Sequence, residues 1–212
     1  METWSDIKLR RLFNRYIRRL KYRKLFLDQI ECLLARHSAV IEQAVKMRIE
    51  TSRLAFLPVF PRPLLDSPMQ AIAVMENGLK RGTRMTGGYT FVMPELVTDI
   101  SEIPDVPYFI FDIEDGLSTL GTSPDEAQKK FKDEGHRGLT DMEIVALGMH
   151  GDVLLQANLY AASSYYGRDR GIDLRMEDGA HPVLCHNACN LDWQHWAVPS
   201  CDAGSIIRCI QD

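Results

Sequence analysis

Residues 181–212 hold most of the side chains in this chain that can bind a metal ion, act as a nucleophile or line a ligand cleft. They include four of the five cysteines, three of the six histidines and two of the three tryptophans. These residues are Cys185, Cys189, Cys201, Cys209, His181, His186, His195, Trp193 and Trp196. Their spacing completes no motif of known chemistry, so the sequence assigns no reaction and leaves three alternatives open.

The first alternative is a zinc site. Cys185, His186 and Cys189 have the close spacing of one half of such a site, because neighbouring ligands on one short segment can share an ion. A structural zinc site usually has a second close pair, and the remaining histidines and cysteines of this segment are too widely spaced to form one. We therefore expect no metal and no other cofactor, and keep these three residues as an alternative ligand set.

The second alternative is a thiol enzyme. Cys201 would be the nucleophile, His195 would be its base, and Asp192 or Asp202 would orient the histidine. No local sequence typical of a known thiol enzyme surrounds Cys201. Whether the protein is an enzyme, for example a hydrolase or a transferase, therefore stays open.

The third alternative is a ligand cleft without catalysis. Aromatic rings supply contact area and arginines supply oriented hydrogen bonds, and both kinds of side chain recur after residue 160. The predicted binding residues are Trp193, Trp196, Arg168, Tyr166, Arg137 and Asp112. The same rings can instead fill a core with their polar tips at its edge, and a carboxylate at a strand end can simply be solvated.

A basic segment precedes the elements that would hold these residues. Residues 1–27 carry nine Lys and Arg against Glu2 and Asp6, a charge of +7, so with a total of −4 the rest of the chain carries −11. Apolar residues recur at intervals of three and four, and no Pro or Gly occurs before Pro58. This pattern predicts one long helix or a helical hairpin over residues 6–52, which packs on its own body, joins subunits or binds a polyanion.

We place the helical extension at residues 1–54, because the composition of the sequence changes after it. Three prolines between Pro58 and Pro63 cannot continue a helix, and they predict a short edge strand or extended segment. Residues 55–212 are therefore expected to form a separate α+β domain.

Capping boxes predict three helix starts in this domain, each with a hydroxyl residue followed three positions later by Glu or Gln. They begin at Ser67, Ser123 and Thr140. In residues 107–116, alternation places Phe109, Phe111 and Ile113 on one face of a core strand, leaves a polar far side, and ends in a turn. Further strands are predicted at residues 158–164, 172–176, 183–186 and 206–210. Because the helices precede the strands, we predict an α+β fold with a mixed, mainly antiparallel sheet and flanking helices.

Composition limits the class of protein. With 212 residues, 45% of them hydrophobic and 25% charged, the chain resembles an ordinary globular protein. It has no apolar run of about 20 residues and no apolar leader at its start, so we expect a cytoplasmic protein without a transmembrane segment. An odd number of cysteines, most of them near one end, predicts reduced thiols rather than a disulfide framework.

Three segments in order resemble an uncharacterised bacterial domain family of unknown function. They are PYFIFD at residues 107–112, GHRGLTDME at 135–143 and WQHWAVPSC at 193–201. The resemblance covers residues 55–209 and leaves the basic segment outside. It implies a shared fold and a bacterial, cytoplasmic origin, and it implies no reaction and no ligand.

Taken together, the sequence favours a binding or interaction module over an enzyme. Its partner would be an unknown small molecule or protein, and the N-terminal helix offers a surface for homo-oligomerisation. Nucleic acid is disfavoured as a partner, because the chain contains no motif that reads base edges.

Overall fold

The computed structural model of the protein describes residues 2–23, 26–64, 76–77, 80–81, 97–99, 102–150, 156–166, 170–177, 181–187 and 196–210. Of the strand residues in this set, 76–77, 80–81, 166, 170, 175–177 and 181–187 are described through their backbone alone, as is residue 23 at the end of the first helix. No helix among the described residues is long and apolar enough to cross a membrane.

The N-terminal segment forms a helical hairpin rather than one long helix. Its elements are α1 (Asp6–Arg23), η1 (Leu27–Gln29), α2 (Ile30–Ala35) and α3 (His37–Met47). Phe26 adopts a left-handed conformation immediately before η1, at φ 50°. The ends of the hairpin meet, because Thr3 forms an antiparallel bridge with Glu50.

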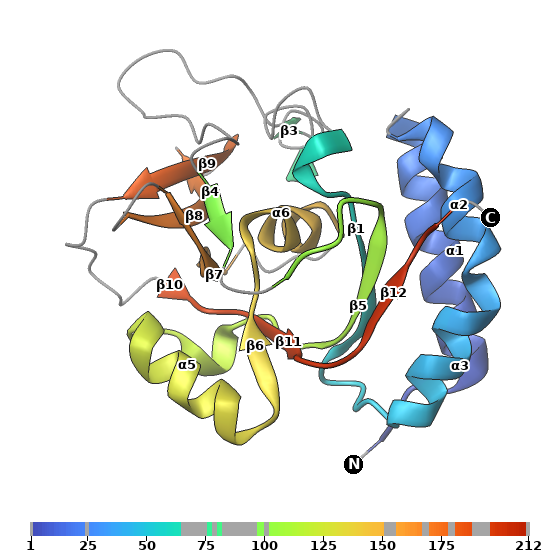
Figure 1. Ribbon diagram of the computed structural model, residues 1–212, viewed down its shortest axis with the longest axis horizontal. Coiled ribbons are helices and arrows are strands. Elements are labelled where there is room, and N and C mark those ends of the chain that lie inside the picture. Colours follow the sequence, from blue (N-terminus) through green and yellow to red (C-terminus); the bar gives the residue numbers. More distant parts are fainter. Residues whose placement is uncertain are drawn as a thin grey trace.

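A three-stranded antiparallel sheet lies against this hairpin (Figure 1). Its strands are β1 (Leu54–Val59), β5 (Tyr108–Ile113) and β12 (Ile206–Arg208), with β5 in the centre. Pro58 lies in β1, which is an edge strand, as the run of prolines predicts. Phe13 of α1 stacks on Phe109 of β5 with ring centroids 5.8 Å apart, so aromatic packing joins the helices to the sheet.

The predicted polar far side of β5 is only partly correct. Ile110 on that side is completely buried, and Tyr108 on the same side donates a hydrogen bond to Glu143. The cover is α6 (Asp141–His150), which lies between the two main sheets (Figure 1). Both faces of β5 are therefore packed, and polarity begins only at Asp112.

The second sheet has five strands. They are β4 (Val97–Asp99), β7 (Asn158–Tyr166), β8 (Arg170–Glu177), β9 (His181–Asn187) and β10 (Trp196–Ala197). All pairs are antiparallel except β10 with β7. The four later strands predicted from sequence are confirmed in β7, β8, β9 and β12, and the fold is α+β with a mixed, mainly antiparallel arrangement.

The remaining elements are short. They are η2 (Arg62–Leu64), η4 (Leu117–Thr119), α5 (Pro124–Asp133), β6 (His136–Gly138), β11 (Ser200–Asp202), and the short pair β2 (Glu76–Asn77) and β3 (Lys80–Arg81). The antiparallel pair of β6 and β11 brings the GHRG segment next to the C-terminal VPSC segment. This pairing places the candidate residues of two distant segments side by side.

Two of the predicted capping boxes are confirmed. At the start of α5, the Ser123 hydroxyl accepts a hydrogen bond from the backbone amide of Glu126. The backbone amide of Ser123 donates to the Glu126 carboxylate at 3.2 Å. The Thr140 amide donates to Glu143 at 2.9 Å, at the start of α6. The box predicted at Ser67 lies outside the described residues.

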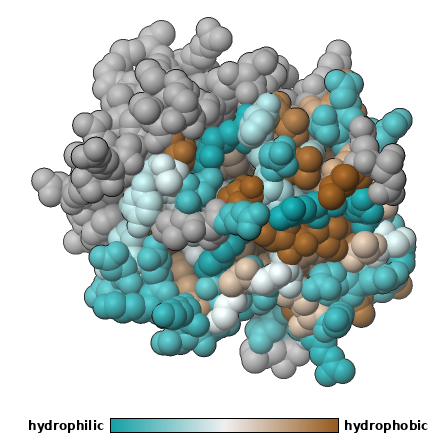
Figure 2. Space-filling model, viewed as in Figure 1, coloured by the Kyte–Doolittle hydropathy of each residue, from teal (hydrophilic) through white to brown (hydrophobic). Residues whose placement is uncertain are grey.

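One hydrophobic core runs through the helical hairpin, the three-stranded sheet, α6 and part of the second sheet. The division at residue 54 stays a prediction, but Leu9, Phe13 and Tyr16 of α1 belong to this core. Figure 2 shows hydrophilic residues over much of the described surface and hydrophobic residues near the middle of the same view. Ile206 and Ile207 of the edge strand β12 are only partly buried.

Candidate functional site

His136 is the centre of a polar cluster that joins β5, β6 and β11. Its Nε2 atom lies 3.1 Å from Asp112 Oδ2, and its Nδ1 atom lies 3.1 Å from Ser200 Oγ. Arg53 donates to Asp112 Oδ2 at 3.0 Å. Burial alone would raise the pKa of Asp112, but the hydrogen bond with His136 and the charge of Arg53 hold that pKa below its ordinary value.

This cluster contains a serine, a histidine and an aspartate, yet its arrangement does not suit a hydrolase. Ser200 is 1% exposed, whereas the Asp112 side chain is 19% exposed. In a catalytic triad the serine faces the substrate and the aspartate is buried, which is the reverse of this order. Asp112 also has a left-handed backbone, at φ 51°. We interpret the cluster as a polar link between strands.

Arg137, which the sequence predicts as a binding residue, is held by the fold. Its Nη1 and Nη2 atoms donate to the two carboxylate oxygens of Glu143, each at 2.7 Å. Tyr108 Oη and the Thr140 amide donate to the same carboxylate. Burial alone would raise the pKa of Glu143, but the charge of Arg137 and these hydrogen bonds lower it. The buried pair is therefore charged and saturated with partners.

Cys201 and Trp196 both contribute to the core. Cys201 in β11 is opposite Arg137 in β6, and burial raises the pKa of its thiol well above the ordinary value. A buried thiol with a raised pKa is a poor nucleophile, which argues against the thiol-enzyme alternative. Trp196 is 6% exposed and belongs to a second hydrophobic cluster with Phe131 and Tyr160.

The remaining predicted residues lie partly outside the described structure. Tyr166 pairs with Arg170 at the end of β7, and Cys185 and His186 lie in β9, all through their backbones alone. Those that fall outside the described residues are Arg168, Cys189, Trp193 and His195. Within the described part of the chain, no three His, Cys, Asp or Glu side chains form a group that could hold a metal ion. The zinc site and the C-terminal cleft stay predictions.

Arg62 forms a second polar network, which the sequence did not predict. Its Nε and Nη2 atoms donate to the two oxygens of Asp141 at 2.9 and 2.8 Å. Nη2 also donates to both oxygens of Asp99, at 2.6 and 2.7 Å. The Ser164 hydroxyl of β7 donates a hydrogen bond to Asp99 and accepts one from the backbone amide of Asp141. The network therefore joins η2, β4, β7 and α6.

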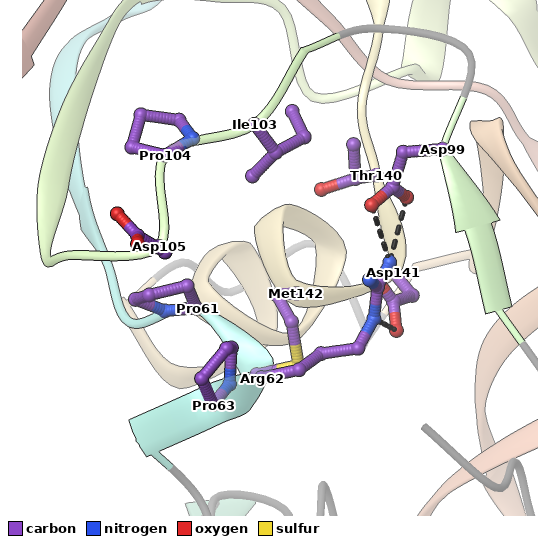
Figure 3. A pocket seen from close by; sticks show the side chains of 10 residues that line it. All are labelled: Pro61, Arg62, Pro63, Asp99, Ile103, Pro104, Asp105, Thr140, Asp141 and Met142. Carbon is purple, nitrogen blue, oxygen red and sulfur yellow. Dashed lines mark hydrogen bonds and ion pairs between the residues drawn. The ribbon is translucent and has the colours of Figure 1, made fainter. Parts of the chain in front are cut away.

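A pocket of about 150 Å³ opens beside this network, and we call it the Arg62 pocket. Its polar walls are Arg62, Asp99, Asp105, Thr140 and Asp141, and its apolar walls are Pro61, Pro63, Ile103, Pro104 and Met142. Figure 3 shows the guanidinium of Arg62 directed at Asp99 and Asp141, with the segment of Ile103 to Asp105 across the pocket from η2. The pocket thus has apolar sides, with Arg62, Asp99 and Asp141 at one end and the Asp105 carboxylate at the opposite side.

The local sequence explains why these groups meet. Pro61 and Pro63 restrict the backbone on both sides of Arg62, so the side chain leaves η2 in a fixed direction. Asp141 is the first residue of α6, where a carboxylate is favoured by the free amides and the helix dipole. The prolines are visible in the sequence, but the partners of Arg62 are 37 and 79 residues away.

The charges around the pocket are unbalanced. Three carboxylates and one guanidinium line the pocket, a formal charge of −2. Asp99 and Asp141 contact Arg62, and Asp105 lies on the other side of the pocket. Burial raises the pKa of Asp141, the hydrogen bonds and charge of Arg62 oppose the rise, and the nearby Asp99 carboxylate adds to it. A further positive charge in the pocket would stabilise the ionised form of Asp141.

Comparisons of the chain with family models, curated proteins and solved structures find no match. The resemblance to an uncharacterised bacterial family therefore stays a prediction, and the function has to be inferred from the geometry alone.

Proposed function

We propose that the protein is a non-catalytic binding module whose ligand site is the Arg62 pocket. The ligand presents a small cationic group, an ammonium or a guanidinium, on a short apolar stem. The single observation that carries this proposal is the excess of carboxylate charge around a pocket with apolar sides. Asp105 is exposed at the edge of the pocket, where it can attract a cation before binding.

Size restricts the ligand further. Cavities of about 150 Å³ in proteins hold molecules of about six non-hydrogen atoms, whereas pockets for drug-sized ligands are about 300 Å³ or more. A coenzyme or a nucleotide is therefore too large to be enclosed here. A small amine, or the end of a lysine or arginine side chain, has the right size and charge.

Three four-carbon compounds of similar size test the proposal by calorimetric titration of the full chain. n-Butylammonium should bind with a dissociation constant of about 0.1–1 mM, which is a reasonable affinity for five non-hydrogen atoms. 1-Butanol and butyrate should bind at least about tenfold more weakly, because one lacks the charge and the other is repelled. Equal binding of all three would refute a cation site.

Two variants of equal charge change separate the pocket from the general acidity of the protein. Asp105→Asn should weaken n-butylammonium binding about two- to fivefold, as expected for one exposed charge. Asp125→Asn, on the exposed side of α5, should leave binding unchanged. If both variants weaken binding equally, the ligand is responding to net charge and the proposed pocket is wrong.

The pH dependence follows from the raised pKa of Asp141. As the pH falls toward that pKa, protonation removes a negative charge and the affinity for n-butylammonium should decrease. The decrease should begin at a higher pH than an ordinary aspartate, near 3.9, would produce. An affinity that rises as the pH falls would contradict the assignment of Asp141 to the site.

An enzyme that uses Cys201 is less well supported. The thiol is completely buried, its pKa is raised, and its described neighbours include the paired Arg137 and Glu143. Iodoacetamide should therefore modify Cys201 more slowly than a free thiol at neutral pH. Faster modification would return the thiol-enzyme alternative to consideration.

A further inference from the structure

The outward face of α1 carries basic side chains that the fold does not use. Lys8 and Arg10 pair with acidic residues of their own segment. Arg19 points inward and donates to the carbonyl of His150, the last residue of α6, at 2.8 Å. These three positive charges therefore have structural partners.

Arg11, Arg15 and Arg18 have no acidic partner. Arg18 Nε donates to the carbonyl of Asn14 in its own helix at 3.3 Å, and Arg15 forms a side-chain hydrogen bond with the neighbouring Tyr16. All three are exposed, and within the described part of the chain no carboxylate forms an ion pair with any of them. Their spacing of four and then three residues places them in one line on the helix. Tyr22 continues this line and is 80% exposed. We call these four residues the arginine stripe; it spans about 16 Å along the helix axis.

The opposite face of α1 is fixed in the core. Its six apolar residues are at most 7% exposed, and they are Leu9, Leu12, Phe13, Tyr16, Ile17 and Leu20. The helix therefore cannot turn this face toward a bilayer or toward the apolar seam of a coiled coil. A partner of α1 meets guanidinium groups and one tyrosine ring.

We propose that the arginine stripe binds single-stranded nucleic acid, independently of the Arg62 pocket. Guanidinium groups match phosphates in charge and geometry, and an exposed tyrosine in line with them offers a face on which a base can stack. Three arginines in a row without acidic partners suit a chain of regularly spaced charges better than a single anion. Tyr22 is the feature that favours nucleic acid over an anionic lipid surface.

This inference differs from the expectation drawn from the sequence. The sequence expectation rested on the lack of a motif that reads base edges, but phosphate pairing and stacking need no such motif. The structure adds that no described carboxylate forms an ion pair with these arginines and that the apolar face of α1 is buried in the core. Binding should therefore depend strongly on salt and little on sequence.

Fluorescence anisotropy with a labelled 12-nucleotide oligo(dT) tests the proposal on the full chain. Binding should be saturable at 25 mM NaCl, and the plot of log affinity against log salt should have a slope of about −2 for three phosphate contacts on a single strand. Raising the salt from 25 to 200 mM should then weaken binding about 60-fold.

The matched variants carry the same change of charge on two surfaces. The triple substitution Arg11→Gln, Arg15→Gln and Arg18→Gln should weaken binding at least about tenfold and bring the salt slope toward zero. The control substitution Lys129→Gln, Lys130→Gln and Lys132→Gln, on the exposed face of α5, should change the affinity less than about twofold. Equal weakening by the two triples would overturn the proposal.

Tyr22 provides the test that separates nucleic acid from other polyanions. Tyr22→Ala should weaken oligo(dT) binding about fivefold or more, and Tyr22→Phe should retain it, because phenylalanine keeps the stacking face. Vesicles that contain phosphatidylserine should bind more weakly than oligo(dT) at the same salt. Stronger binding to vesicles, or no effect of Tyr22→Ala, would overturn the proposal; neither result bears on the Arg62 pocket.

Discussion

Arg137 and Arg62 meet the same kind of partner in different settings. Each guanidinium donates to a carboxylate at the start of α6, Arg137 to Glu143 and Arg62 to Asp141. Around Glu143 a tyrosine hydroxyl and an amide supply further donors. Around Asp141 there is a second carboxylate and a pocket. The first arrangement is balanced and filled, and the second has excess negative charge and open space.

This difference separates a structural ion pair from a binding site. A buried pair of one guanidinium and one carboxylate, with no described pocket beside it, stabilises one arrangement of strands and helix and leaves no net charge for a ligand. Arg62 lies beside an open pocket lined by three carboxylates, and the net negative charge that remains there can be neutralised by a ligand. Perturbed pKa values occur in both places, so a shifted pKa alone does not locate the site.

The largest expected effect is the loss of the filled pair. Arg137→Ala leaves the buried Glu143 without its counter-charge, and we expect a loss of about 3–5 kcal/mol in the free energy of unfolding. Urea unfolding measures this loss. The double variant Arg137→Met with Glu143→Gln should lose less than the single variant, because no uncompensated charge remains. A single variant that loses under about 1 kcal/mol would show that the pair is not structural.

A smaller loss is expected at the pocket. Arg62→Ala should lower the free energy of unfolding by about 2 kcal/mol. This loss is smaller than that of Arg137→Ala, because water can enter the pocket and solvate the carboxylates of Asp99 and Asp141. Methylguanidinium at about 20 times its dissociation constant should recover about 2 kcal/mol in thermal unfolding of this variant. It should not rescue Arg137→Ala, which has no described pocket beside it. Rescue of both variants, or of neither, would remove the distinction between the two regions.

The polar link at His136 is expected to respond to acid. Because the pKa of Asp112 is lowered in the folded protein, its contribution to stability is present above the unfolded value, near 3.9, and is lost as the pH falls through the folded value. Asp112→Asn should therefore lower the free energy of unfolding by about 1–2 kcal/mol at pH 5 and by much less at pH 3. The value at pH 5 is kept small because the Asp112 side chain is partly exposed. Urea unfolding between pH 5 and 3 checks this, and a cost that grows as the pH falls contradicts it.

The smallest effect is expected at a cap outside both regions. Ser123→Ala removes the hydroxyl that caps α5, and a loss of about 1 kcal/mol is expected from the lost hydrogen bond. Thermal unfolding is sufficient to measure it, with Ser123→Thr as the variant that keeps the hydroxyl. A loss as large as that of Arg137→Ala would mean that burial does not determine the order of these stability losses.

The sequence predicted local structure well because its signals are local. Ser123-Pro124-Asp125-Glu126 specifies a helix start by itself, and the alternation before Asp112 specifies a strand. The choice between one helix and a hairpin was left open by the sequence, because no Gly or Pro occurs before Pro58 to mark a turn, and the left-handed residue before η1 is a phenylalanine. The strands near the C-terminus were predicted for the same local reasons.

The candidate site was harder to predict because its residues come from distant segments. Arg62, Asp99 and Asp141 belong to no shared motif, and Asp141 was visible only as part of a capping box. Arg137 and Cys201 were chosen for their chemistry, yet the pairing of β6 with β11 brings them together and buries Cys201 completely. Residue type indicates what a side chain can do, and burial with its partners decides whether it remains free to do it.

The most direct test of the central claim is a two-dimensional ¹H–¹⁵N NMR titration of the full chain with n-butylammonium. We predict saturable shifts that centre on the amides of Ile103, Asp105 and residues 140–142, and no comparable shifts with 1-butanol. Shifts that centre instead on β6 and β11, or that fail to saturate, would contradict the assignment of the Arg62 pocket as the binding site.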